Sequence, residues 1–133
     1  MAKKEFTYRG KDMQELLAMS IEDFAKLLKA RARRSVLRGI DKKMMKKVER
    51  AKELVKAGKR AKPIKTHKRA TIVLPQMVGV QFAVYRGNEF QIIDIQDAML
   101  GHYLGEFALT RKRLMHGKAG IGATKSSTAI TAR

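Results

Sequence analysis

The sequence VQFAVYRGNEFQIIDI, residues 80–95, decides the fold. In its first half, Val80, Phe82 and Val84 occupy every second position, which is the period of a β-strand. The dipeptide Gly87-Asn88 interrupts this pattern, and such a pair favours a two-residue hairpin loop. The residues that follow, EFQIIDI, form the return strand. The stretch therefore predicts an antiparallel β-hairpin.

The register of this hairpin follows from the length of its loop. A two-residue loop places Tyr85 opposite Phe90 and Phe82 opposite Ile93. Both pairings set apolar side chains across from each other, which stabilises an antiparallel pair. A slip of one residue would turn the whole apolar set to the other face, so we expect this register.

Short segments on either side of the hairpin extend this centre. IKTH at 64–67 and TIVL at 71–74 contain β-branched and apolar residues and predict strands. After the hairpin, residues 97–100 predict a short helix that ends at Gly101. We interpret residues 64–110 as an α+β core with a short, mainly antiparallel sheet.

The N-terminal part of the chain carries helix start signals. Asp12 and Glu15 stand at capping-box spacing at the start of a short helical turn over 12–19. Ser20 and Asp23 repeat this signal before a helix through IEDFAKLLKARARR. The apolar stripe of this helix consists of Phe24, Leu27 and Leu28. We expect one helix here, with arginines in its last turn, where cations suit the helix dipole.

A second long helix is predicted over residues 42–57. Gly39 separates it from the first helix, Asp41 is its expected N-cap, and Gly58 is expected just after its C-terminus. Its stripe consists of Met44, Val48, Ala51 and Val55. We expect this stripe to pack on the core, and residues 58–63 to form a basic linker that Pro63 keeps non-helical.

The charge of the chain indicates an anionic partner. Its 133 residues include 30 Lys and Arg against 12 Asp and Glu, which gives a net charge of +18. Such an excess disfavours the compact state unless an anion neutralises it. Residues 1–69 carry +15, residues 70–110 carry −3, and residues 111–133 carry +6. A near-neutral body between two basic arms is typical of a nucleic-acid-binding protein.

This pattern divides the chain into three parts. Residues 1–63 are interpreted as a basic helical N-terminal region with its linker, 64–110 as the α+β core, and 111–133 as a flexible basic tail. The tail is rich in Gly, Ser, Thr and Lys and has no sustained apolar period, so we expect it to become ordered only on a polyanion.

Several function classes find no support in the sequence. The absence of cysteine excludes disulfides, thiol chemistry and a zinc ribbon. The first ten residues lack the apolar run of a signal peptide, and the longest uncharged run is shorter than the roughly 20 residues of a membrane helix. GKAGIGATKS at 117–126 has Ala123 where a phosphate-binding loop requires Lys. The three histidines lack metal-ligand spacing, so we predict no metal site. No nucleophile, base and oxyanion site can be assembled from the sequence, so we predict no cofactor and no enzymatic activity.

The stretch YRGNEFQIIDIQDAMLGHYLGEFALT, residues 85–110, resembles the signature of ribosomal small-subunit protein family nineteen. The family pattern runs from a hairpin glycine through an apolar strand to G-H-x-L-G-E-F-x-x-T. The matching signature residues here are Gly87, Gly101, Leu104, Gly105, Glu106, Phe107 and Thr110. IKTHKR at 64–69 and LPQMVG at 74–79 match in kind and order. FTYRG, LRG and the C-terminal HGKAGIGATKSS are similar to the archaeal and eukaryotic branch, called protein fifteen in eukaryotic numbering.

This resemblance implies a structural role in the cytoplasmic ribosome. It implies a small α+β body whose sheet packs against helix and which binds rRNA in the head of the small subunit, beside other head proteins. It also implies a tail that extends toward the decoding region and the aminoacyl-site tRNA. Two alternatives remain: a general DNA-compacting protein, on charge alone, and a small basic enzyme.

We predict contacts with RNA at the basic residues of three segments. These residues are Arg31, Arg33, Arg34, Arg38, Lys65, His67, Lys68, Arg69, Arg111, Arg113, His116, Lys118 and Lys125. Within the signature, Leu104 and Phe107 are expected to be core anchors, and Gly101 and Gly105 to be required by backbone turns. For Glu106, a bond to nearby backbone and a bond to a cation are both open.

Overall fold

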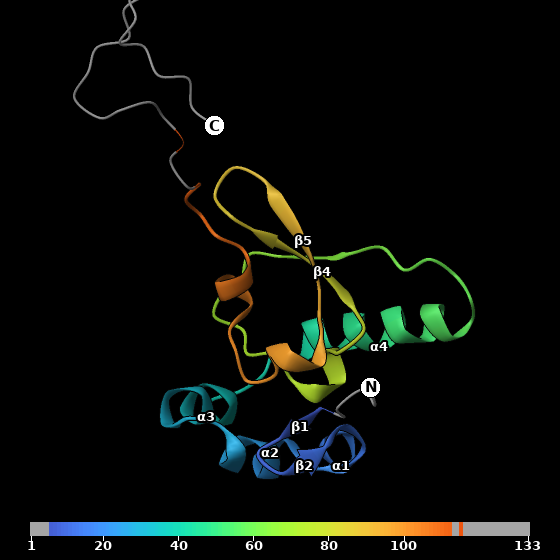
Figure 1. Ribbon diagram of the computed structural model, residues 1–133. Helices are drawn as coiled ribbons and strands as arrows, with labels where there is room; N and C mark the ends of the chain where they lie inside the picture. Colours follow the sequence, from blue (N-terminus) through green and yellow to red (C-terminus); the bar gives the residue numbers. More distant parts are fainter. Residues whose placement is uncertain (1–5, 113–114, 116–133) are drawn as a thin grey trace, which may run out of the picture.

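The predicted hairpin forms the centre of the molecule. The computed structural model describes residues 6–112 and residue 115 (Figure 1). Strands β4 (Gln81–Tyr85) and β5 (Phe90–Asp94) pair antiparallel, with Tyr85 opposite Phe90 and Phe82 opposite Ile93, which confirms the register. The Arg86 amide donates to the Glu89 carbonyl at 3.0 Å across the two-residue loop. Gly87 has a φ of 114°, which a side chain would strain.

A third strand makes the central sheet mixed. Strand β3 (Ile64–Thr66) pairs parallel with β4, and the order is β3-β4-β5. Five residue pairs of this sheet are antiparallel and three are parallel. A separate two-stranded antiparallel sheet joins β1 (Thr7–Tyr8) and β2 (Lys11–Asp12). The α+β class with a small, mainly antiparallel sheet is therefore confirmed.

The prediction of a strand over TIVL was wrong. The structure gives these residues only an isolated bridge between Ile72 and Tyr103, followed by a short 3₁₀ helix η1 (Pro75–Met77). The Val73 amide donates to the His102 carbonyl at 2.9 Å, and its carbonyl accepts from the Gly101 amide at 3.1 Å. The apolar run reflects burial, because residues 72–74 are all within the core.

The predicted helix over residues 21–34 is broken into two. Helix α2 (Ile21–Leu27) ends before α3 (Ala30–Leu37), because Leu28 and Lys29 take extended ψ angles of 158° and 152°. The break places the Leu28 side chain in the core, where it is 3% exposed. The Arg33 guanidinium donates to the carbonyls of Lys26 and Leu28 at 3.2 Å. These bonds satisfy carbonyl groups that have no helical hydrogen-bond partner at the break.

The other helix predictions hold, with two corrections at the level of side chains. Helix α1 (Met13–Ala18) forms, but the Asp12 side chain makes no capping bond. At the start of α2, Ser20 Oγ accepts from the Asp23 amide at 3.1 Å. Asp41 is the N-cap of helix α4 (Lys42–Lys56) as expected, whereas Val55, the last member of the apolar stripe, is 55% exposed.

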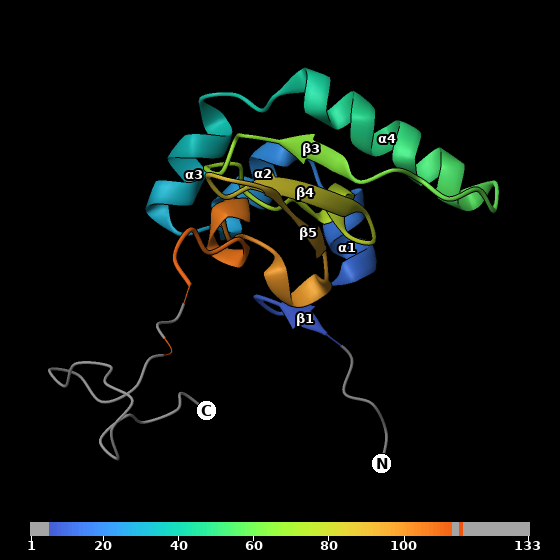
Figure 2. The same ribbon diagram turned by 90° about the horizontal axis from the view of Figure 1, so that it is seen from above.

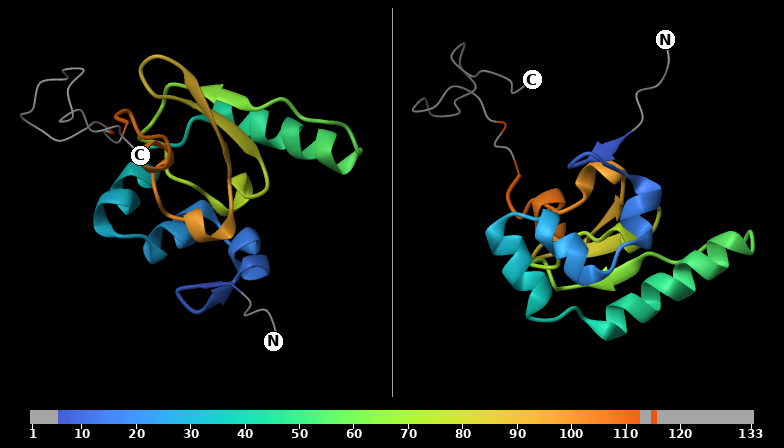
Figure 3. Two further views of the ribbon diagram at one scale, coloured as in Figure 1. Left: turned by 45° about the horizontal axis from the view of Figure 1, so that its top comes forward. Right: turned by 90° about the horizontal axis from the view of Figure 1, so that it is seen from below.

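One hydrophobic core joins the N-terminal helices to the sheet. Figures 1 and 2 show α1 and α2 beneath the sheet, α3 at one end, and α4 running alongside β3. The core includes Phe24 from α2, Val48 from α4, and Phe82 from β4. After β5, the chain forms two short 3₁₀ helices, η2 (Asp97–Met99) and η3 (Leu104–Phe107), which return past α3 (Figure 3). No helix of the described residues is long and apolar enough to span a membrane.

Candidate nucleic-acid interface

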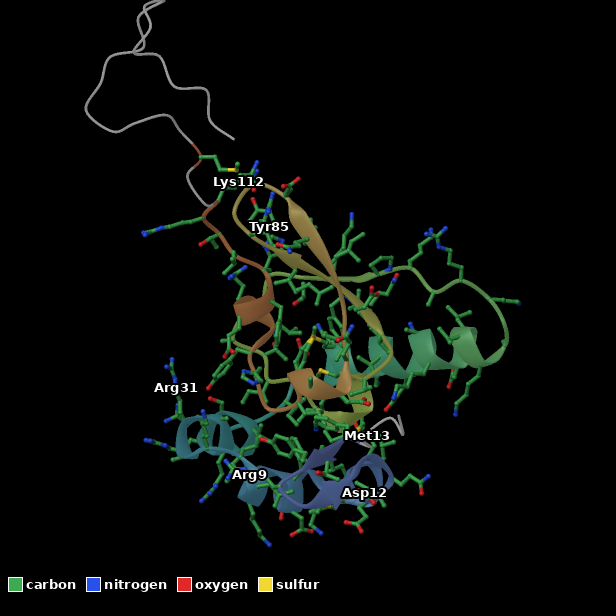
Figure 4. All side chains as sticks on the ribbon, viewed as in Figure 1. Arg9, Asp12, Met13, Arg31, Tyr85 and Lys112 are labelled. Atoms are coloured by element: carbon green, nitrogen blue, oxygen red, sulfur yellow. The ribbon has the colours of Figure 1, made fainter. Side chains whose placement is uncertain are left out.

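Helix α3 presents the first set of predicted RNA contacts. Arg31, Arg33 and Arg34 lie on this helix and Arg38 follows its last turn, and all four side chains are exposed. Figure 4 shows Arg31 on the outer side of α3. Its guanidinium carbon lies 5.7 Å from the centre of the Tyr103 ring, which is within the range of a cation–π contact. The set therefore forms a basic ridge on the surface.

The IKTHKR segment places Lys65, His67 and Lys68 in three different environments. The Lys65 ammonium lies 5.4 Å from the centre of the Phe90 ring. The His67 ring stands 4.5 Å from the Tyr85 ring. The Lys68 ammonium donates to Asp41 Oδ2 at 2.7 Å.

Arg69 serves the fold itself. Its guanidinium donates to the carbonyls of Tyr85 at 2.7 Å and Gly105 at 2.8 Å, and also to the Ala108 carbonyl. These bonds tie the end of β4 to the segment that carries the family-like signature. Because its guanidinium donates to three carbonyls inside the protein, Arg69 is less available to RNA than the exposed arginines of α3.

A groove brings two of the predicted sets together. It has a volume of about 860 Å³ and lies between the end of α3, the start of α4 and residues 67–74. Its lining includes Arg38, Lys42, His67 and Lys68. We call this the basic groove. Basic residues about 30 positions apart in the sequence thus meet at one surface. Such a cluster of cations is what a site for a polyanion requires.

Asp41 is the acidic group within the basic groove. Its Oδ1 accepts from the amides of Lys43 at 3.0 Å and Met44 at 3.4 Å, which caps α4. Its Oδ2 accepts from the Lys68 ammonium, and this bond, followed by the capping amides, lowers the pKa of Asp41. The carboxylate thus positions the start of α4 and holds Lys68, and its charge offsets that of one groove cation.

The signature residues form a tight turn against Arg69. Leu104 is fully buried, as predicted, and Thr110 is exposed. Phe107 is only partly buried: its ring packs against the edge of the core and lies 5.9 Å from the His102 ring, so it anchors the core less completely than Leu104. The neighbouring Ala108 fills the buried position.

Two glycines of the signature are sites of close approach. A side-chain Cβ at Gly101 would stand 2.6 Å from the Tyr8 hydroxyl, and its φ is +77°. A Cβ at Gly105 would stand 3.0 Å from Cβ of Arg69 and 3.1 Å from its carbonyl oxygen. Gly101 is therefore favoured by its backbone conformation, and Gly105 by its tight contact with the backbone of Arg69.

Glu106 bonds nearby backbone, which was one of the two options open at the sequence level, and it also contacts the His102 ring. Its Oε1 accepts from the Tyr103 amide at 3.2 Å, and its Oε2 lies 2.7 Å from His102 Nδ1. The bond to His102, followed by that to the amide, lowers the pKa of Glu106. The side chain thus closes the turn of η3.

The tail contacts are only partly described. Arg111 is exposed beyond η3, and the chain continues through Lys112 past the hairpin (Figure 4). The remaining predicted contacts, Arg113, His116, Lys118 and Lys125, lie outside the described residues. Within residues 6–112 and 115, no three His, Asp or Glu side chains gather in a group that could hold a metal ion.

The sequence-based prediction missed two features of this surface. Lys42 lines the basic groove, but its place in an evenly basic helix gave it no distinguishing signal. Tyr85 and Phe90 form an aromatic cluster with His67, with ring centres 4.5–5.2 Å apart. The predicted register already paired these two rings, so the cluster could have been found from it.

Comparison with known proteins places this surface in a family. A model of the family described as Ribosomal protein S19 matches residues 26–116, more than half of the chain. The chain belongs to the ribosomal protein S19 family. Its match begins within α2 and contains the basic groove and the whole signature, so the resemblance predicted from the sequence is confirmed.

Relatives extend this match over nearly the whole chain. Two proteins named small ribosomal subunit protein uS19, from two strains of Halobacterium salinarum, are each 52% identical to it over 123 residues. The alignment covers 92% of this S19 protein and 88% of each relative. Both relatives come from an archaeon, which agrees with the predicted branch of the S19 family.

Proposed function

We propose that this S19 protein is a structural constituent of the small ribosomal subunit and binds rRNA in the subunit head. Identity of 52% to proteins named as small-subunit components is the observation that carries the proposal. The S19 family is structural, so no enzymatic activity is expected, and the protein acts within the cytoplasmic ribosome beside other ribosomal proteins. A tail that reaches the aminoacyl-site tRNA is the finer part of the proposal.

The basic groove and the ridge of α3 are the surfaces we assign to rRNA. Exposed guanidinium groups can hold phosphates through two parallel hydrogen bonds, whereas a lysine acts as a point charge. Arg38 connects the two surfaces, since it follows α3 and also lines the groove. Each phosphate neutralised releases counterions, so affinity should fall steeply with salt.

A salt titration of rRNA binding tests this assignment. We expect Arg34→Ala and Arg38→Ala to weaken binding to a head rRNA fragment and to reduce the salt slope by about 0.7 for each phosphate that is no longer neutralised. Lys26→Ala is the matched control, because Lys26 is an exposed cation already paired with Asp23 at 2.7 Å. Slopes that equal the control would remove these arginines from the interface.

Footprinting on small-subunit rRNA, with other head proteins present, tests the function itself. Discrete protections in the head support the proposal. Diffuse protection that disappears at modest salt, together with preference for duplex DNA in competition, would favour the DNA-compacting alternative instead.

A further inference from the structure

A second groove lies between α4 and the sheet. It runs between α4, residues 60–63 and the outer face of the sheet, and has a volume of about 860 Å³. Its apolar lining is Ala51, Leu54, Ala61, Pro63, Ile64, Ala83, Phe90 and Ile92, and its basic lining is Lys47, Arg50, Arg60, Lys62 and Lys65. We call it the apolar groove.

The sheet register explains which side chains of the sheet face this groove. Lys65 pairs with Ala83, and Ala83 pairs with Ile92, so these residues form one row across the three strands. The adjacent row places Phe82 and Ile93 in the core. Side chains alternate between faces, so the first row belongs to the outer face.

Two aliphatic side chains of this groove are left exposed by the described part of the chain. Ile92 is 60% exposed, and Leu54, across the groove on α4, is 42% exposed. Paired exposure of this kind on a single concave surface is typical of a protein-docking site rather than of scattered surface residues.

The rim of the groove carries charge that the described part of the chain does not neutralise. None of its five basic residues forms an ion pair with a described acidic residue. Lys65 instead lies over the Phe90 ring. The occupant must therefore offer anionic groups at its edges and apolar groups at its centre.

The chemistry of the floor distinguishes a protein from an RNA occupant. A base would need a free flat π-face to stack on. Phe90 is the aromatic residue of the floor, and its ring is already surrounded by Lys65, His67 and Tyr85 at 5.2–5.4 Å. The exposed floor is aliphatic, which fits leucine-like side chains. The chain's own tail is an unsuitable occupant, because residues 111–133 contain six cations and no acid.

We propose that the apolar groove binds an acidic amphipathic segment of a neighbouring protein in the small subunit. Its apolar side chains would cover Leu54 and Ile92, and its carboxylates would meet the five basic residues of the rim. This inference rests on the proposed function, because the occupant is a neighbouring protein of the small subunit.

Peptide binding to the purified full-length protein is the first test. The probe is a 14-residue helical peptide with Leu on one face and Glu on the other, and the comparison peptides replace Leu by Ser or Glu by Lys. At about 0.15 M salt, where surface charges are screened beyond about 8 Å, we expect only the Glu/Leu peptide to bind well. Equal binding of the Glu/Ser peptide would show general charge attraction and overturn the proposal.

Matched variants locate the binding. Leu54→Gln with Ile92→Thr should weaken the Glu/Leu peptide at least tenfold. The control is Leu17→Gln on α1, where the leucine is 47% exposed but outside the groove; it should change nothing. Unchanged affinity of the double variant would place the peptide elsewhere and refute the assignment.

Cross-linking within assembled subunits identifies the natural occupant. A photoreactive residue at position 92 should cross-link to a peptide that interleaves acidic and apolar residues. A cross-link to rRNA, to a basic peptide or to nothing would overturn the proposal. The double variant should keep its rRNA affinity. If the wild-type chain itself does not bind rRNA, that result counts against the proposed function and not against the groove.

Discussion

Arg69 offers a quantitative test of the fold. Its guanidinium bonds three backbone carbonyls from two segments, at Tyr85, Gly105 and Ala108. A hydrogen bond to a charged group contributes about 1.5–3 kcal/mol. Arg69 is half-buried, so water can replace part of these bonds after truncation. We expect Arg69→Ala to lower the free energy of unfolding by about 3 kcal/mol, which is the lower end for the removal of two such bonds.

Urea unfolding of the purified chain, followed by circular dichroism, measures this change at constant m-value. Arg69→Lys should recover about one bond, because a single ammonium cannot span the three carbonyls. Arg38→Ala is the control, since an exposed substitution changes stability by about 0.5 kcal/mol or less. If Arg69→Ala stayed within that same margin, the three bonds would not hold the signature segment in place.

Three further substitutions probe the signature. Gly101→Ala should destabilise by about 1–3 kcal/mol, because its Cβ would meet the Tyr8 hydroxyl at 2.6 Å at a φ of +77°; a melting temperature equal to wild type would contradict this. Phe107→Ala should cost only about 1–2 kcal/mol, since the ring is partly buried; thermal unfolding checks the value. Glu106→Gln tests a pH effect: the folded-state pKa of Glu106 is lowered, so its contribution is present above the ordinary glutamate value of 4.5 and is lost as pH falls below it. The difference in the free energy of unfolding between wild type and Glu106→Gln should therefore shrink in acid. A difference that is about equal at pH 6 and pH 3 would exclude this pH linkage.

The hairpin could be predicted because its information is local. Two apolar pairings and one Gly-Asn loop specify its register within 16 residues, and the structure reproduces it. The caps at Ser20 and Asp41 were predictable for the same reason, since a capping side chain bonds amides only two or three residues away.

The sequence-based predictions failed where contacts between residues far apart in the sequence determine the structure. Leu28 continues a helical stripe in the sequence, but its burial in the core breaks the helix before it can reach residue 34. Arg69 looked like one more surface cation, because its carbonyl partners lie 16 to 39 residues away and no local pattern reveals them. The basic groove likewise needed the fold to bring Arg38 and Lys68 to one surface.

The packing of Leu28 beside Gly101 also has a consequence for synthesis of the chain. A Cβ at Gly101 would lie 2.9 Å from Leu28 Cδ2, so the two residues are neighbours although roughly seventy residues separate them. At about 5–20 residues per second, the helices of the first half would wait roughly 4–15 seconds for this partner. During that interval their apolar side chains are uncovered on a highly cationic nascent chain. Newly made copies should therefore depend on escort by a chaperone until residue 101 emerges, and a chain truncated after residue 95 should be far more sensitive to protease than the full-length chain.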